Sequence, residues 1–175
     1  MTGWRWLAAG VAAVLVAEAA AGLAILETGA FDPRASTPHN AIVAWATHET
    51  MVHAMHKQAR GVIPPRALTP AETIAGLHTY ERDCISCHGG PGVPRGAWTQ
   101  GINPSPPFLL DASRRWSPGE LYWIVKHGVK MTAMPAWGPT ESDGKIWDMV
   151  AFLEAMPEMR PADFQRLQRR APPHR

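Results

Sequence analysis

The chain has 175 residues, including 17 prolines and 15 glycines, and its 17 Lys and Arg residues against 15 Asp and Glu residues give a net charge of +2. So small a basic excess argues against a general nucleic-acid-binding protein, which normally has a strongly positive surface. Its two cysteines are too few for a disulfide scaffold, and alone they cannot complete a four-ligand zinc site or hold an iron–sulfur cluster.

An apolar segment near the amino terminus predicts a single-span membrane anchor within residues 1–30. The run at 7–26 contains one charged residue, Glu18, and as a helix it would be about 30 Å long, which matches the hydrocarbon core of a bilayer. A cleaved signal peptide is the alternative, because Ala17-Glu18-Ala19 resembles a cleavage site. The apolar run continues beyond that tripeptide, which favours an uncleaved anchor.

Four alanines repeat at every fourth position of this anchor and would form a smooth ridge on one side of a helix. Such a ridge lets another transmembrane helix pack closely. Glu18 lies near the middle of the span, where an ionisable group usually faces protein or is protonated. We interpret these features as a contact with a partner transmembrane helix; the alternative is that the ridge faces lipid. The alanines are Ala9, Ala13, Ala17 and Ala21.

The residues after the anchor predict an all-α protein. Residues 31–68 are expected to form a connector that contains one helix at 38–60, which Thr37 opens as N-cap and Gly61 ends. At the other end of the chain, residues 160–175 hold five arginines against one aspartate. We expect this segment to be a basic mobile tail.

Between the connector and the tail, the sequence predicts a domain of helices and loops at 69–159. Capping boxes with proline at the first helical position open two of the helices. Segments rich in glycine and proline separate the helices and predict loops, and no segment alternates in the manner of a strand. The helices are expected at 70–83, 118–127 and 143–155, and the loops at 89–116 and 129–141.

The two cysteines belong to the sequence Cys84-Ile85-Ser86-Cys87-His88, which has the C-x-x-C-H spacing of c-type haem attachment. Two thiols on one helical turn can each bond to a vinyl group of one haem, and the adjacent histidine then supplies a nitrogen to the iron. A redox dithiol is one alternative, but it expects a βαβ pattern, which this sequence lacks. A zinc site is another, and it needs two further ligands. We therefore predict one covalently attached haem c.

The second axial ligand of the iron must come from elsewhere in the chain. Haem electron-transfer sites commonly pair histidine with methionine. Met131 and Met134 both lie in the loop expected at 129–141, and Pro135 would keep the chain beside Met134 out of a helix. Met149 falls in an expected helix, which favours packing. The downstream candidates are Met131, Met134, Met149, Met156, Met159 and His127.

In the order and spacing of its features, the segment 69–159 resembles the class I cytochromes c of the bacterial membrane-anchored branch. The resemblance implies an all-α class I cytochrome c haem domain, preceded here by a transmembrane helix and an additional linker helix. The features that carry it are Gly76, Tyr80 and Cys84 at intervals of four, the C-x-x-C-H motif, Pro106-Pro107-Phe108-Leu109, the sequence LYWIVKHG, the M-P-A-W loop and the pattern I-W-x-x-V-A-F-L.

The same resemblance implies roles for individual residues at the cofactor. Met134 would be the sixth iron ligand, and a backbone carbonyl at Pro107 would accept a hydrogen bond from the ring of His88, which orients that ligand. Tyr80 and Trp137 are expected beside the haem. Cys84 and Cys87 would hold the haem covalently.

These features predict an electron-transfer protein rather than an enzyme. We expect a single-span cytochrome of a bacterial inner membrane, with its haem domain on the periplasmic side. It would pass single electrons from a quinol-oxidising complex or a dehydrogenase to a terminal oxidase or reductase. One alternative is a permanent haem c subunit of a membrane oxidoreductase complex; another is a haem-based ligand sensor or peroxidase-like enzyme, which would need an open iron site.

Histidines and methionines gather in the helix expected at 38–60. His48, Met51 and Met55 would share one face, with His56 farther round. Imidazole and thioether groups together suit copper(I), so copper binding is one hypothesis. The alternative is a methionine-containing packing face with histidines toward solvent.

Overall fold

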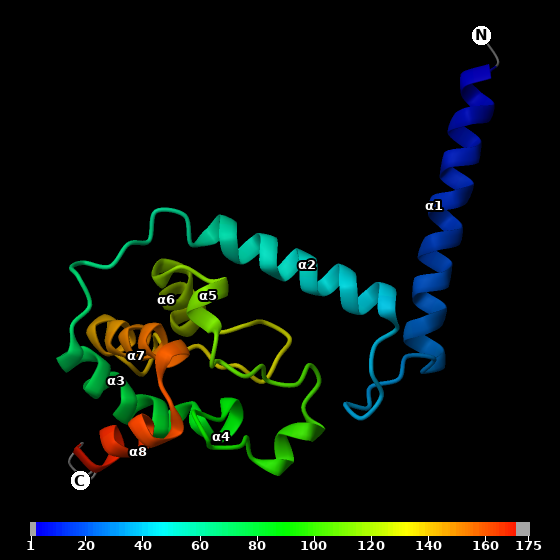
Figure 1. Cartoon of the computed structure of the whole chain (residues 1–175). Coiled ribbons are helices and arrows are strands. Elements are labelled where there is room, and N and C mark those ends of the chain that lie inside the picture. Colours follow the sequence, from blue (N-terminus) through cyan, green and yellow to red (C-terminus); the bar gives the residue numbers. More distant parts are fainter. Residues whose placement is uncertain (1–2, 171–175) are drawn as a thin grey trace. The chain divides into compact units, whose positions relative to one another are not determined.

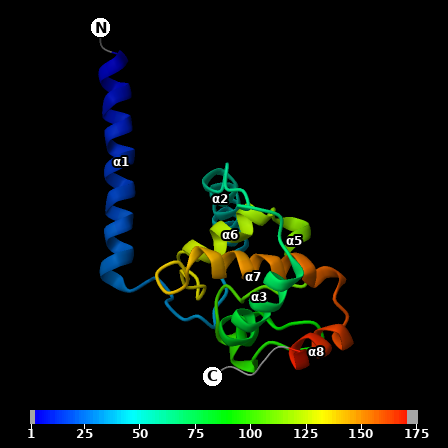
Figure 2. The ribbon, with the colours of Figure 1, turned by 90° about the vertical axis from the view of Figure 1, so that its left-hand side faces the viewer.

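The computed structural model describes residues 3–170, and among these it contains helices and no strand. The chain divides after Thr37 into two compact units, which are described separately. Figures 1 and 2 show the long helix α1 in the first unit and the remaining helices in the second.

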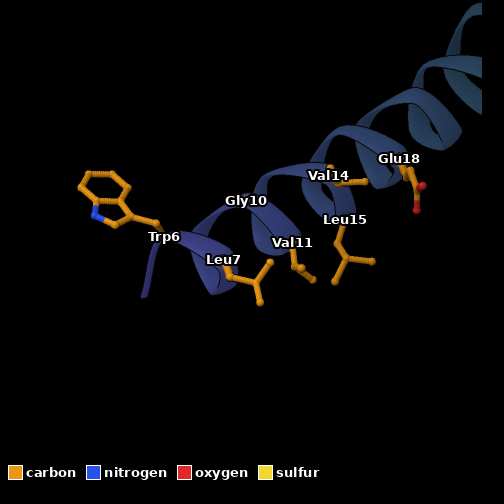
Figure 3. Close-up of a pocket in the computed structure, with 7 residues that line it drawn as sticks. All are labelled: Trp6, Leu7, Gly10, Val11, Val14, Leu15 and Glu18. Carbon is orange, nitrogen blue, oxygen red and sulfur yellow. The ribbon is translucent and has the colours of Figure 1, made fainter. Parts of the chain in front are cut away.

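The first unit is the helix α1, Gly3–Thr28, followed by an irregular connector. All of its side chains are exposed, and it is the one described helix that is long and apolar enough to cross a membrane. Figure 3 shows Leu7, Val11 and Leu15 along one side of α1, with Glu18 on the same apolar face. In the connector, Asp32 and Arg34 form an ion pair at 2.8 Å.

The second unit begins with α2, Ala41–Gln58, which is shorter than the predicted helix at 38–60. Asn40, rather than Thr37, is the N-cap, because its side-chain oxygen accepts a hydrogen bond from the Val43 N–H at 2.9 Å. At the other end Ala59 is the C-cap. Gly61 then adopts a φ of +80°, which directs the chain away from the helix axis.

The carboxyl-terminal half of α2 packs on α6, Pro118–His127, and so is more than a connector. Met55 and Ala59 are buried there, and His56 forms an ion pair with Glu120. Gly119 permits the close approach, since a Cβ at this position would lie 1.9 Å from the Val62 carbonyl oxygen.

The helices predicted within residues 69–159 are confirmed. They are α3 (Pro70–Asp83), α6 and α7 (Asp143–Ala155), and both predicted capping boxes are present. α3 packs across α7 (Figures 1 and 2), where a Cβ on Gly76 would lie 1.9 Å from the Asp148 carbonyl oxygen. The predicted loop at 89–116 also contains two short helices, η1 (Ala97–Gly101) and α5 (Ala112–Arg115).

The prediction of a mobile tail at 160–175 is wrong for most of its length. After a short turn, η2 (Met156–Glu158), residues Pro161–Arg170 form the helix α8. Phe164 is fully buried, and its ring centroid lies 6.2 Å from that of Phe152. A proline at the start of the segment and an apolar pair at Phe164 and Leu167 are the sequence signals of this helix. Residues 171–175 lie outside the described part of the chain.

We expect Phe164→Ala to lower the free energy of unfolding by about 3–5 kcal/mol, because it removes a fully buried aromatic side chain. Chemical denaturation of the holoprotein measures the change. Gln165→Ala, at an exposed neighbouring position of the same helix, is the control and should change the stability by less than about 0.5 kcal/mol. An equal effect of the two substitutions would mean that α8 does not dock through Phe164.

Candidate functional site

The C-x-x-C-H sequence lies at the end of α3, where the chain makes one further helical turn, α4 (Ile85–His88). The backbone N–H groups of Cys87 and His88 both donate to the Cys84 carbonyl oxygen, at 3.1 and 2.9 Å. Both cysteines are free thiols; Cys84 is buried and Cys87 is partly exposed. Burial raises the pKa of the Cys84 thiol to about 12.

His88 is held by a contact that fixes both its orientation and its protonation. Its Nδ1 lies 2.7 Å from the carbonyl oxygen of Pro107, the hydrogen bond expected at that proline. A carbonyl only accepts, so Nδ1 carries the proton and Nε2 keeps a lone pair. Burial lowers the pKa of the ring, which the hydrogen bond to Pro107 opposes. The ring is therefore neutral and suited to bind a metal.

Tyr80 fixes the residue that follows this histidine. Its hydroxyl donates to the Gly89 carbonyl oxygen at 2.7 Å in a buried setting, and burial raises the pKa of the phenol. Gly89 has a φ of +68°, and a Cβ there would lie 2.8 Å from the Val93 carbonyl oxygen. The chain thus turns sharply after His88 in a way that requires glycine.

Arg95 is a site residue that the sequence analysis missed. Its guanidinium donates to the Pro106 carbonyl oxygen and lies 4.2 Å from the centroid of the Phe108 ring. It therefore holds the segment from which Pro107 reaches His88. One signal was available in the sequence, since Arg95 is the only Lys or Arg within residues 89–113.

The loop with Met134 is ordered by its own hydrogen bonds. The Val129 N–H donates to the Met134 carbonyl oxygen at 3.2 Å. The Met134 N–H donates to Thr132 Oγ1 at 3.0 Å, and that hydroxyl donates to the Val129 carbonyl oxygen at 2.7 Å. Thr132, which the sequence analysis also missed, therefore connects both sides of the loop.

The other candidates for the sixth ligand have different surroundings. Met131 is 90% exposed and has a φ of +62°, a conformation that few residues other than glycine adopt. Met149 and Met156 are buried in the helical core, and Met159 packs against it. His127 is exposed, whereas Met134 is partly buried.

Trp137 lies three residues after Met134, where hydrogen bonds join the loop to the backbone of α6. Its N–H donates to the Val125 carbonyl oxygen at 3.2 Å, and the Gly138 N–H donates to that of Lys126 at 2.9 Å. The indole packs against the buried core. Its Nε1 is buried and has no hydrogen-bond partner within residues 3–170.

The predicted site residues form two groups. Backbone adjacency and hydrogen bonds join Tyr80, Cys84, Cys87, His88 and Pro107, while Met134 and Trp137 lie in the loop after α6. Both groups adjoin one core, since Cys84 belongs to it and Trp137 packs against it. Two free thiols on one turn, a neutral imidazole, a thioether in an ordered loop and an unpaired indole N–H fit a c-type haem.

Two of the four residues of the copper hypothesis, Met55 and His56, have other partners. Met55 is buried where α2 packs on α6. His56 pairs with Glu120, and its ring lies 4.9 Å from that of Trp116. In the described part of the chain, no three His, Cys, Asp or Glu side chains gather in a way that could hold a metal ion.

A comparison with protein families gives a match. The family model described as cytochrome C oxidase, cbb3-type, subunit III matches residues 71–153. This range contains α3, α4, α6 and most of α7, together with both groups of site residues. No curated protein matches the chain.

We expect Tyr80→Phe to destabilise the protein by about 1–3 kcal/mol, because the buried Gly89 carbonyl loses its hydrogen-bond donor. Tyr122→Phe is the matched control. The Tyr122 hydroxyl accepts a hydrogen bond from Lys126, which also lies 2.6 Å from Asp143. Lys126 therefore keeps a partner when the Tyr122 hydroxyl is removed, so Tyr122→Phe should destabilise the protein less than Tyr80→Phe. Thermal unfolding of both variants makes the comparison, and a larger effect of Tyr122→Phe would contradict this reading of the site.

Proposed function

Since this chain belongs to the class I cytochromes c through its domain at residues 71–153, we propose that it is a single-span membrane cytochrome with one haem c. Its function is the transfer of single electrons between redox proteins. The observation that carries the proposal is the ordered loop that contains Met134. Because hydrogen bonds already hold this loop in place, Met134 would serve as the second axial ligand without a rearrangement of the loop when the iron changes its oxidation state.

One haem is proposed because the chain has two cysteines and hence one attachment motif. Cys84 and Cys87 would each form a thioether bond, and His88 and Met134 would be the axial ligands. Haem c supplies an iron ion that accepts and releases one electron. The contact of His88 with Pro107 supports the assignment, since it keeps Nε2 available and the ring in one orientation.

The choice of Met134 over the other methionines follows from their surroundings. An iron ligand must be held in an ordered position. Met131 is exposed at the surface, and Met149 and Met156 are buried in the core. A ligand pair that is held by the protein in both oxidation states keeps structural change on electron transfer small. Trp137 Nε1 is buried and has no hydrogen-bond partner within residues 3–170. This supports a position of the Trp137 indole beside a polar group of the haem, which would accept its hydrogen bond.

The location and partners are also proposals. α1 supports a single-span anchor by its length and composition, and we place the haem domain on the periplasmic side of a bacterial inner membrane. The donor would be a quinol-oxidising complex or a dehydrogenase, and the acceptor a terminal oxidase or reductase. An anchor would confine the search for these partners to the membrane surface.

A second candidate function is a permanent subunit of a membrane oxidase, which the description of the matching family model favours. α1 has two distinct faces for such contacts. At 100° per residue, Glu18 lies about 120° around the helix from the middle of the ridge of Ala9, Ala13, Ala17 and Ala21. The glutamate and the alanines therefore face different neighbours.

Substitution of Met134 by alanine should remove the methionine–iron charge-transfer band of the oxidised protein. It should also lower the reduction potential, by an amount on the order of 100 mV, because a thioether ligand raises the potential. Met131→Ala in the same loop is the control and should leave both unchanged, since Met131 is exposed. Optical spectra and potentiometric titration give the two readouts. A Met134→Ala protein with an unaltered spectrum and potential would show that the sixth ligand lies elsewhere.

Purification from the native membrane in mild detergent distinguishes a carrier from a subunit. A free carrier should be recovered as one haem protein without stoichiometric partners, and a permanent subunit should be recovered with a fixed complex. Mass spectrometry and staining for covalently bound haem identify the components. A band without covalent haem would contradict the proposed role of Cys84 and Cys87.

A further inference from the structure

The two halves of α2 have different surroundings. The carboxyl-terminal half is docked on α6 through Met55, Ala59 and the ion pair of His56 with Glu120. The amino-terminal half extends beyond α6 (Figure 1), and residues 41–48 are all exposed. Its large side chains, Ile42, Val43 and Trp45, are 76%, 40% and 65% exposed.

The first six residues of this half, 41–46, have no polar side chain to keep them in water. At 100° per residue, Ile42, Val43 and Trp45 spread over about 160° of the helix surface, and alanines occupy much of the rest. A helix at the surface of a soluble domain normally has one apolar stripe and one polar face. Between residues 35 and 48 there is no Asp, Glu, Lys or Arg, so the segment is also uncharged.

The position of this half in the chain indicates what covers it. Twelve residues separate the end of α1 at Thr28 from the start of α2 at Ala41, and fully extended they reach about 40 Å. If α1 spans a bilayer, the exposed half of α2 stays within that distance of the membrane surface. The connector adds an exposed Phe31, and its two charges, on Asp32 and Arg34, neutralise each other.

We propose that residues 41–46 of α2 insert into the lipid interface of the bilayer that α1 spans. Tryptophan and aliphatic side chains favour the boundary between headgroups and acyl chains. Apolar side chains around much of the helix fit a lipid phase better than a protein groove, which would cover a single stripe. This inference rests on the proposed function, in which α1 spans the membrane.

The consequence is a haem domain with a defined orientation at the membrane. The docked half of α2 is joined to α6 at Gly119, which contacts the Val62 backbone, and at Glu120. A helix that is held by lipid at one end and by α6 at the other restricts rotation of the domain about its tether. Since residues 35–48 carry no charge, the contact does not require anionic lipid.

Spin labelling of the full-length holoprotein in phosphatidylcholine nanodiscs tests this contact. Ala46→Cys places the label on the exposed half and leaves Ile42, Val43 and Trp45 intact, while Gln165→Cys on α8 is the control and Leu15→Cys reports on α1. With both native thiols bonded to the haem, each variant has one reactive cysteine, and a spectrum recorded without either reagent corrects for relaxation of the label by the iron. Power-saturation spectra compare accessibility to oxygen with accessibility to a water-soluble nickel chelate.

We expect the ratio of oxygen to nickel accessibility at residue 46 to exceed that at residue 165 by about threefold, and Trp45→Glu should reduce this difference. Equal ratios at 46 and 165 with a high ratio at 15 would overturn the inference and leave the anchor intact. A low ratio at residue 15 would reject the anchor as well. Protection of residue 46 from both reagents would overturn lipid contact in favour of a second copy of the chain.

Discussion

The crossing of α3 and α7 is the contact on which the haem domain depends. Gly76 brings the backbone of α3 against the Asp148 carbonyl, where a Cβ would lie at 1.9 Å and leave no room for any larger residue. This approach lets Leu77 and Tyr80 pack into a core with Phe152. α3 ends one residue before Cys84, so the same crossing fixes where the C-x-x-C-H turn begins.

Beyond this crossing, the residues of the site are positioned mainly by hydrogen bonds. Tyr80 reaches the Gly89 carbonyl, and the Pro107 carbonyl reaches His88. On the loop after α6, Thr132 accepts from the Met134 N–H and donates to the Val129 carbonyl oxygen. Helices thus supply the frame and the C-x-x-C-H turn, and loops supply Pro107 and Met134. Backbone carbonyls and hydroxyls suit this task because they fix direction as well as distance.

Two helices extend the frame at its margins. α8 covers the core with Phe164, and Gln168 bonds to Glu81 on α3. α2 packs on α6 at its carboxyl-terminal end and exposes uncharged apolar side chains at its amino-terminal end. A class I cytochrome c domain is therefore preceded by the helix α2, which follows α1 and its connector along the chain. With the proposed lipid contact of α2, this arrangement would make orientation at the membrane a property of the chain itself.

The sequence alone determined the elements that depend on neighbouring residues. The boxes at Thr69 and Ser117 set the starts of α3 and α6, because a cap needs only the next three residues. The C-x-x-C-H motif is equally local. Tertiary structure supplied the difference in burial between Met134 and Met131, and it added Arg95 and Thr132 to the site. It also decided that α8 is docked and that α2 is held by α6. Those contacts join residues 87 and 64 positions apart, and no local pattern encodes which distant surface a helix will meet.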